Sequence, residues 1–400
     1  MPGARKSKAG GETAGKGRHL AVLCLAVVLT LSVWFAGTAA VPALIAAELV
    51  TPARAGWLTM AVQLGFVLGT LVSAILSLAD RRDPRLLFLA SALLASAATF
   101  AQVLVAPSGS AGLVLRFVAG AAMAGVYPVG MKLAASWAER DLGLLIGLLV
   151  GAVTLGSALP HLIPGLLGDV DWRAAYLGAG ALSALGGLLI LSFRPGPKLG
   201  ARPPFRPAQA LEAWRNKGLR LANLGYLGHM WELYAMWAWI GLFLAQTWGA
   251  GTGAFVFTVI ASGALGCVAA GLVADRWNRA GVAAACMVTS GGCAVLIGPA
   301  AALGPAVVLA VALVWGFTVV ADSAQFSACI VTLSPPDYVG TMLTVQTSLG
   351  FLLTAVTIGI LPAAVAWLGW EWAFVVLAPG PLLGAYAMWR LRPMLPTVRR

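Results

Sequence analysis

A histidine and a glutamate lie three residues apart in the stretch GHMWELYAMW (residues 228–237), inside an otherwise apolar segment. If the segment is a helix, His229 and Glu232 share a face with Met236, because residues three and four apart are neighbours on a helix surface. A third such group, Asp322, lies in a second apolar segment. Apolar surroundings favour the protonated form of a carboxyl group, and histidine titrates near neutral pH, so these groups could bind and release protons.

Two basic side chains share another apolar segment. On a helix, Arg116 and Tyr127 lie about 20° apart around the axis, whereas Lys132 lies about 160° from Arg116. Arg116 could therefore face a bound solute together with Tyr127, or it could bind backbone carbonyl groups of a neighbouring helix. Lys132, near the end of the segment, fits a side chain that reaches toward the aqueous surface.

The segments that carry these residues are long and apolar enough to cross a membrane. The chain is 60% hydrophobic and 10% charged, whereas a soluble domain is about 25% charged. A helix of about 20 residues crosses a hydrocarbon layer about 30 Å thick. The pattern predicts an all-α integral membrane protein with twelve transmembrane helices, at residues 20–47, 57–79, 86–109, 112–137, 142–168, 174–193, 221–247, 252–274, 280–304, 305–333, 338–368 and 372–389.

The placement of the basic residues predicts the orientation. Of 26 Lys and Arg residues, only Arg54 and Arg173 fall on one side of the twelve spans, and Arg116 and Lys132 lie within a span. All the others fall on the side of the two termini, which the positive-inside rule makes the cytoplasmic side. The net charge of +12 is thereby explained without nucleic acid as a partner. We expect a multi-pass protein of the bacterial cytoplasmic (inner) membrane, with the lipid bilayer as its surroundings and both termini cytoplasmic.

The two halves of the chain resemble each other. The segment LADRRDPR follows the second span, and VADRWNR follows the eighth, so that Asp80 and Asp275 stand at matching positions. A Pro-rich basic stretch separates the halves, as expected for a parallel repeat of six helices. The predicted division is a disordered basic tail (1–18), an N-terminal six-helix bundle (19–193), a cytoplasmic linker (194–218), a C-terminal six-helix bundle (219–392) and a second tail (393–400).

This arrangement resembles the major facilitator superfamily (MFS) of transporters. The loop motif of the family, G-x-x-x-D-R-x-G-R-R, is matched by Gly271, Asp275, Arg276 and Arg279. The first half keeps a partial copy, and the segment RFVAGAAMAG resembles the family's fourth-helix motif. The resemblance implies two six-helix bundles related by a pseudo-two-fold axis along the membrane normal. It also implies a conformational latch between the halves, formed by Asp80, Arg81, Arg85, Asp275, Arg276 and Arg279.

The latch has a geometric expectation. By the resemblance, Asp80 would lie near the start of the eleventh span, around 338–341, and Asp275 near residues 141–144. A carboxylate just past a helix C-terminus is disfavoured by the local dipole, so a partner at a neighbouring helix N-terminus would stabilise it. The alternative is a solvated charge cluster that sets only the orientation.

The resemblance also places spans 1, 4, 7 and 10 around a central cavity. Spans 4, 7 and 10 carry the charged residues Arg116, Glu232 and Asp322, and charges in membranes usually face water or a partner. Both carboxyl groups should lie about 18 Å from the cytoplasmic ends of their helices, near the midplane. We therefore expect His229, Glu232 and Asp322 to face the cavity, as proton-coupling residues. The expected substrate contacts are Trp34, Arg116, Tyr127, Met236 and Gln325.

These expectations describe a proton-coupled transporter of a small organic solute, with an anionic group paired with Arg116 as one option. Glu232 is favoured over Asp322 as the proton carrier, because His229 lies one turn away. No cofactor or metal is expected, and the protein should act as a monomer.

Other interpretations stay open. His229 and Glu232 could form a structural contact with each other, or two ligands of a metal site with Asp322 as the third. The transporter could be a proton-driven exporter of drugs or amphipathic metabolites, or a receptor that does not transport. A membrane enzyme would need a nucleophile motif, and the sequence shows none.

Overall fold

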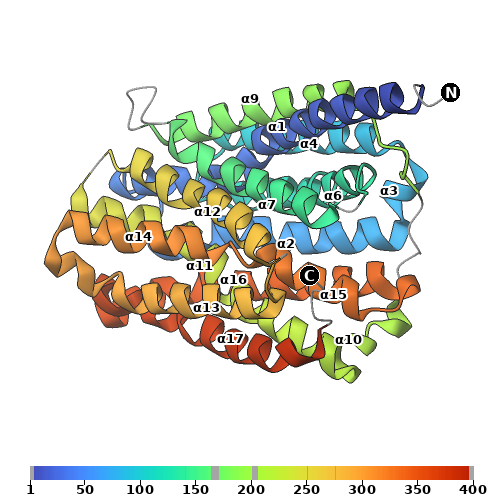
Figure 1. Cartoon of the computed structure of the whole chain (residues 1–400). Helices are drawn as coiled ribbons and strands as arrows, with labels where there is room; N and C mark the ends of the chain where they lie inside the picture. The colour runs from blue at the N-terminus through green and yellow to red at the C-terminus, as the bar shows by residue number, and fades with distance from the viewer. Residues whose placement is uncertain are drawn as a thin grey trace.

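The computed structural model describes residues 4–139, 141–163, 171–200, 206–249, 251–274 and 276–395, and only the backbone of residues 4–14 and 336. Within these residues the chain forms helices and no strand (Figure 1). The α-helices are α1 (Ala4–Ala46), α2 (Pro52–Leu76), α3 (Leu78–Arg81), α4 (Pro84–Ala101), α5 (Ser110–Met123), α6 (Tyr127–Ala135), α7 (Leu142–Ala158), α9 (Trp172–Leu189), α10 (Glu212–Arg215), α11 (Lys217–Trp248), α12 (Gly253–Ala274), α13 (Arg279–Leu296), α14 (Pro305–Val319), α15 (Ser323–Leu333), α16 (Val339–Trp372) and α17 (Pro379–Leu391).

Short 3-10 helices extend or join several of these. They are η1 (Gln102–Leu104), η2 (Leu159–His161), η3 (Ile190–Ser192), η4 (Pro207–Gln209), η5 (Pro299–Leu303), η6 (Pro336–Tyr338), η7 (Ala373–Leu377) and η8 (Arg392–Met394). The first helix begins at Ala4, inside the segment for which the sequence predicts a disordered tail.

The twelve predicted spans are confirmed. Ten stretches of the described residues are long and apolar enough to cross a membrane, and the last of them holds both α16 and α17. The remaining predicted span, the seventh, is α11, which contains His229 and Glu232 together with several tryptophans and tyrosines and is not among these ten stretches. Many outward-facing side chains are apolar, including Leu265, Leu383 and Trp367, as a lipid-facing surface requires.

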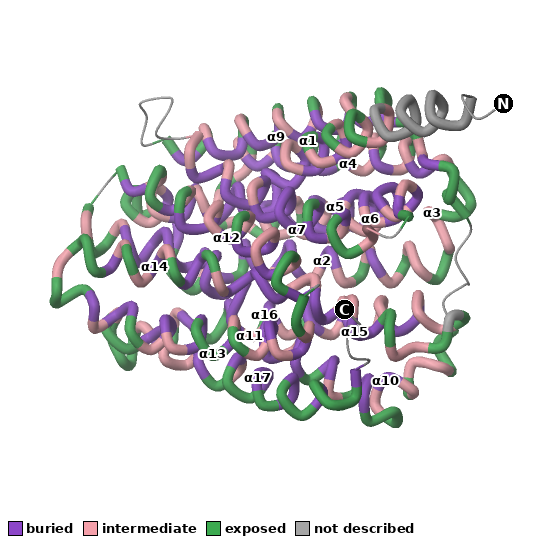
Figure 2. Tube along the Cα trace, viewed as in Figure 1, coloured by how far each residue is buried: buried purple, intermediate pink, exposed green. Residues whose placement is uncertain are grey.

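The helices form two halves of six spans each. Residues up to α9 make one half and residues from α11 onward the other, and the two lie side by side in Figure 1. Across the boundary α2 packs on α16 and α7 packs on α12. Figure 2 shows the buried residues concentrated along this boundary and inside each half, with exposed turns on the periphery. We call the end where α1 begins and α17 ends the termini end, and the other the opposite end.

Glycines let helices within one half approach closely. A Cβ atom at Gly120 of α5 would overlap the backbone oxygen of Val62 in α2. Reciprocally, a Cβ atom at Gly65 of α2 would overlap the backbone oxygen of Phe117 in α5. Small residues allow such backbone-to-backbone packing in membranes, where helices gain stability from van der Waals contact.

Two spans are broken at matching places in the two halves. The fourth span divides into α5 and α6 around residues 124–126, and the tenth divides into α14 and α15 around residues 320–322. Pro128 follows the first break, and proline lacks the N–H group that a continuous helix would use. Asp322 ends the second break. The sequence predicts a continuous helix over 305–333, so the second break is a correction.

Candidate functional site

A cavity lies between the two halves, toward the termini end. It is bounded by the first turns of α7 and α16 and by the part of α15 beyond the break. Its lining is apolar, aromatic and hydroxyl-bearing, and no Asp, Glu, Lys, Arg or His among the described residues belongs to it. The lining residues are Thr70, Tyr127, Pro128, Met131, Ile146, Val150, Val153, Thr154, Tyr226, Met230, Leu233, Tyr234, Trp237, Val320, Ser323, Ala324, Ser327, Gly340, Leu343, Thr344, Thr347 and Phe351.

An aromatic cluster forms the floor of this cavity and closes it from the opposite end. Phe66 of α2 and Phe351 of α16 lie with ring centroids 4.5 Å apart. Trp34 of α1 contacts both rings, at 4.8 and 5.4 Å. Tyr234 of α11 lies 5.0 Å from Phe351 and 5.5 Å from Trp237. Such tilted ring contacts add to the stability gained by burial, and residues of both halves contribute to the cluster. We call these five residues the aromatic floor.

The predicted cavity residues have different fates. Tyr127 lines the cavity, and its contact with the substrate stays a prediction. Trp34 is buried in the aromatic floor instead. Met236 and Gln325 are buried and do not belong to the lining. Helix periodicity predicts that Met236 shares a face with Glu232 and that Gln325 shares a face with Asp322. Both faces turn away from the cavity.

Arg116 is fully buried inside the N-terminal half. Its Nη1 donates to the backbone oxygen of Val33 at 3.0 Å, and its Nη2 donates to that of Trp34 at 2.6 Å. Gly37 leaves room for the guanidinium, because a Cβ atom there would lie 3.2 Å from Arg116 Nε. The carbonyl-binding alternative therefore describes Arg116, which does not belong to the cavity lining.

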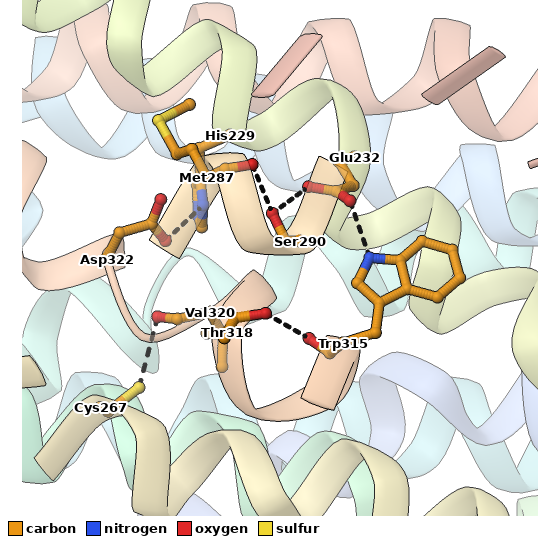
Figure 3. Close-up of polar contacts among 9 residues, drawn as sticks. All are labelled: His229, Glu232, Cys267, Met287, Ser290, Trp315, Thr318, Val320 and Asp322. Atoms are coloured by element: carbon orange, nitrogen blue, oxygen red, sulfur yellow. Dashed lines mark hydrogen bonds and ion pairs between the residues drawn. The ribbon is translucent and has the colours of Figure 1, made fainter. Parts of the chain in front are cut away.

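The predicted proton-coupling residues His229, Glu232 and Asp322 lie in one region inside the C-terminal half (Figure 3). His229 of α11 places Nδ1 2.9 Å from Oδ1 of Asp322, with both side chains at least 98% buried. The two atoms are at ion-pair distance, although the contact lacks the direction of a hydrogen bond, and His229 Nε2 has no partner among the described residues. Val320, at the same break, has its backbone oxygen 3.4 Å from Cys267 Sγ. The break in the tenth span is thus held by side chains of α11 and α12.

Glu232 has separate partners. Trp315 of α14 donates Nε1–H to Oε1 at 2.7 Å, and Ser290 of α13 lies with Oγ 2.7 Å from Oε2. Ser290 Oγ is also 3.2 Å from the backbone oxygen of Met287. A hydroxyl group carries one proton, so it can donate to only one of these acceptors at a time.

This geometry accommodates both forms of the carboxyl group. When Glu232 is ionised, Ser290 donates to it. When Glu232 is protonated, its hydroxyl can donate to Ser290, which then donates to Met287. The indole of Trp315 donates in either case. A proton can therefore be gained or lost at Glu232 by rotation of one hydroxyl, without leaving a buried polar atom unpaired.

Two expectations about these residues need correction. His229, Glu232 and Asp322 do not line the cavity but face the interior of the C-terminal half. His229 also contacts Asp322 and not Glu232. Sharing a helix face puts two residues on the same side, but the direction in which each side chain extends along the helix depends on packing. The cavity is nevertheless close, because Val320 and Ser323 at the break both line it.

The loop after the second span holds an ion pair that the sequence did not predict. Lys132 of α6 donates to Asp80 and, at 2.7 Å, to the backbone oxygen of Ala79. Lys132 is therefore a partner of the loop within its own half. Asp83, which replaces a motif glycine, caps α4 and pairs with Arg85 at 2.8 Å. The hydrogen bond from the Arg85 side chain lowers the pKa of Asp83.

The other members of the predicted latch stay as predictions. Asp275 lies outside the described residues. Arg81 and Arg276 are exposed. Asp141, near which Asp275 was expected, pairs with Lys16 of α1 at 2.6 Å.

Most residues of the cavity lining are uncharged and were not predicted from the sequence. Three tyrosines line it, and so do four hydroxyl-bearing residues on α15 and α16. Ser323 and Ser327 are four residues apart in the tenth span, so helical spacing next to Asp322 carried a usable signal. Ser290, the partner of Glu232, follows Thr289 near the middle of the ninth span, and nothing in its sequence context distinguishes it from a serine that packs against its own helix.

Comparison with known proteins identifies the class. The family profile of the Major Facilitator Superfamily matches residues 22–358. The chain therefore belongs to this superfamily of secondary transporters, and the predicted fold class, with two six-helix bundles, is confirmed. No curated protein sequence matches the chain.

Two solved structures share the fold. A mutant of the nucleoside transporter NupG matches with a TM-score of 0.71 and 13% sequence identity, over 93% of this chain and 99% of the other. A bacterial homologue of the human lysosomal transporter Spinster, inward-facing and unoccupied, matches with a TM-score of 0.66 and 14% identity, over 94% and 96%. At these identities the likeness shows the fold alone.

Proposed function

We propose that this transporter moves a small uncharged organic solute across the cytoplasmic membrane by alternating access, with both termini in the cytoplasm. The observation that carries the proposal is the cavity lining, which combines aromatic faces with hydroxyl groups. Within the part of the chain that the structure describes, it contains no charged side chain. A buried ion in such a lining would lack a counter-charge, which is strongly unfavourable. The substrate is therefore expected to be uncharged, and the option of an anionic group at Arg116 is set aside.

We also propose that transport is coupled to protons at Asp322 and His229, with Glu232 as a second titrating group. His229 is the neighbour of Asp322 in this structure, so the reason that favoured Glu232 now supports Asp322. The pair sits at the break of the tenth span. Protonation of Asp322 would remove its attraction for His229 and free α15, whose residues Ser323 and Ser327 line the cavity. A change of charge would thus alter the wall that contacts the solute.

Asp322→Asn should separate transport from the pH gradient. The asparagine keeps the shape but cannot titrate, so uptake into proteoliposomes driven by an imposed pH gradient should fall at least about tenfold, while exchange between two solute-loaded compartments continues. Glu371→Gln, a matched change at an exposed carboxylate, should leave both activities unchanged. If Asp322→Asn keeps full gradient-driven transport, Asp322 is not a coupling residue. The same measurement on Glu232→Gln decides whether Glu232 contributes.

The solute must first be found. A panel of uncharged compounds should be tested for binding by thermal shift and for flux in proteoliposomes. It should include nucleosides, which the name of NupG suggests, and amphipathic drugs, which an exporter would carry. Binding without flux of any member would favour the receptor interpretation. Preference for organic anions over all neutral compounds would contradict the assignment from the lining.

A further inference from the structure

Gln63 of α2 lies beyond the aromatic floor, on the face of the helix that turns toward the centre of the molecule. Thr70 of the same helix lines the cavity, and Phe66 belongs to the floor. At 100° per residue, Gln63 lies about 20° from Thr70 around the axis and about 40° from Thr59. At 1.5 Å per residue it is about 10 Å farther than Thr70 from the termini end. The central face of α2 therefore continues as a polar stripe past the floor.

The side chain of Gln63 has no partner. Its exposed fraction is 0%, and neither Oε1 nor Nε2 has a hydrogen-bond partner among the described residues. A primary amide offers two donors and an acceptor with two lone pairs. Burying such a group without partners is unfavourable, and natural proteins rarely keep one without a reason.

Other polar atoms near this level are also poorly satisfied. The indole nitrogens of Trp34 and Trp237 are buried without partners among the described residues. The hydroxyls of Thr38 and Thr59 lie 3.4 Å apart, at the edge of hydrogen-bond distance. These residues come from α1, α2 and α11, so both halves contribute to the group.

We propose that Gln63 is the polar centre of a second solute-binding half-site, beyond the aromatic floor, which forms when the opposite end opens. Thr38 and Thr59 complete it, and the indoles of Trp34 and Trp237 become available as donors when the floor separates. The amide favours an uncharged solute that carries a hydrogen-bond donor beside an acceptor, such as an amide, a heterocyclic base or a polyol. This inference rests on the proposed function, because it assigns a site to the second state of alternating access.

The proposal explains why an unfavourable group is kept. In the state seen here the amide is closed off and unpaired. In the state with the opposite end open, it would bind water or solute. Gln63 thus makes the closed state less stable relative to the open one, and this bias keeps both states populated.

A replacement of Gln63 tests this bias through the sign of the change in the midpoint of thermal unfolding. Gln63→Met keeps the length of the side chain and removes its polar atoms. The midpoint of thermal unfolding should rise by a few degrees, because the closed state loses an unpaired amide. Transport of the neutral solute identified in proteoliposomes should fall at least about tenfold. A fall in the midpoint would instead show that a bound water or an unseen partner satisfies Gln63, and would overturn the proposal.

Cysteine labelling tests the opening itself. In a chain whose five native cysteines, all free, are replaced by alanine, Gln63→Cys should react with a small membrane-impermeant thiosulfonate added at the opposite end. Thr99→Cys is the control. Thr99 of α4 is also buried with an unpaired hydroxyl, but α4 packs on α5 and α9 inside the N-terminal half, whereas α2 packs on α16 across the boundary. It should stay unlabelled. Equal protection of both cysteines would overturn the proposal. Labelling needs no solute, so it remains readable if the proposed transport is not found.

Discussion

Gly253→Ala is expected to hold the opposite end open and to lower net transport at least about tenfold. Gly253 begins α12 in the C-terminal half, and a Cβ atom there would overlap the backbone oxygen of His161, which ends η2 in the N-terminal half. The two halves meet at this point, and a backbone atom cannot rotate away as a side chain can. Overpacking of this kind costs about 1–3 kcal/mol. Applied to one of two states, it shifts their equilibrium about 5–150-fold.

The shift can be measured with a cysteine in place of Thr38. This residue is buried in this structure and lies between the aromatic floor and the opposite end. Gly253→Ala should raise the rate at which a membrane-impermeant thiol reagent labels Thr38→Cys. Gly292→Ala is the matched control, because it lies inside α13 with open space around the added methyl group. Labelling and transport that stay at the level of the control would show that the contact with His161 does not close this end.

Gly120→Ala is expected to reduce the yield of folded protein sharply. Helix propensity alone favours alanine over glycine by about 1 kcal/mol. Here the added Cβ overlaps the backbone oxygen of Val62, so α2 and α5 must separate. Separation also loosens the contact of Gly65 with Phe117. The loss of packing over two helices should outweigh the gain in propensity.

The yield of monodisperse protein after size-exclusion chromatography and the midpoint of thermal unfolding report this effect. Gly143→Ala in α7, where the methyl group meets nothing within 4 Å, should match the wild type in both. An unchanged midpoint in Gly120→Ala would mean that α2 and α5 do not pack as closely as described.

Element positions were predictable from the sequence, because hydrophobic length alone separates a membrane span from a loop. The twelve spans agree with the helices to within a few residues at most boundaries. The break at 320–322 was not predictable in the same way. No proline or glycine lies between Gly316 and Asp322. The break is stabilised by contacts from other helices, such as the one between Cys267 and Val320.

Pairing was less predictable than position. The sequence indicated that His229, Glu232 and Asp322 belong to one region, and the structure brings them into one half. It could not indicate that Ser290 and Trp315 would bind Glu232, because those contacts depend on how α13 and α14 pack on α11. Lys132 illustrates the same limit. Its distance from Asp80 along the chain, 52 residues, gives no local signal.

The absence of charged side chains among the described residues of the cavity lining has an electrical consequence. An uncharged solute carries no current, so the charge moved in each cycle would count the coupled protons alone. Moving one elementary charge across the membrane is worth about 2.3 kcal/mol per 100 mV. The membrane voltage would then drive the accumulation of a neutral compound even without a pH difference, and the ratio of current to solute flux would give the stoichiometry directly.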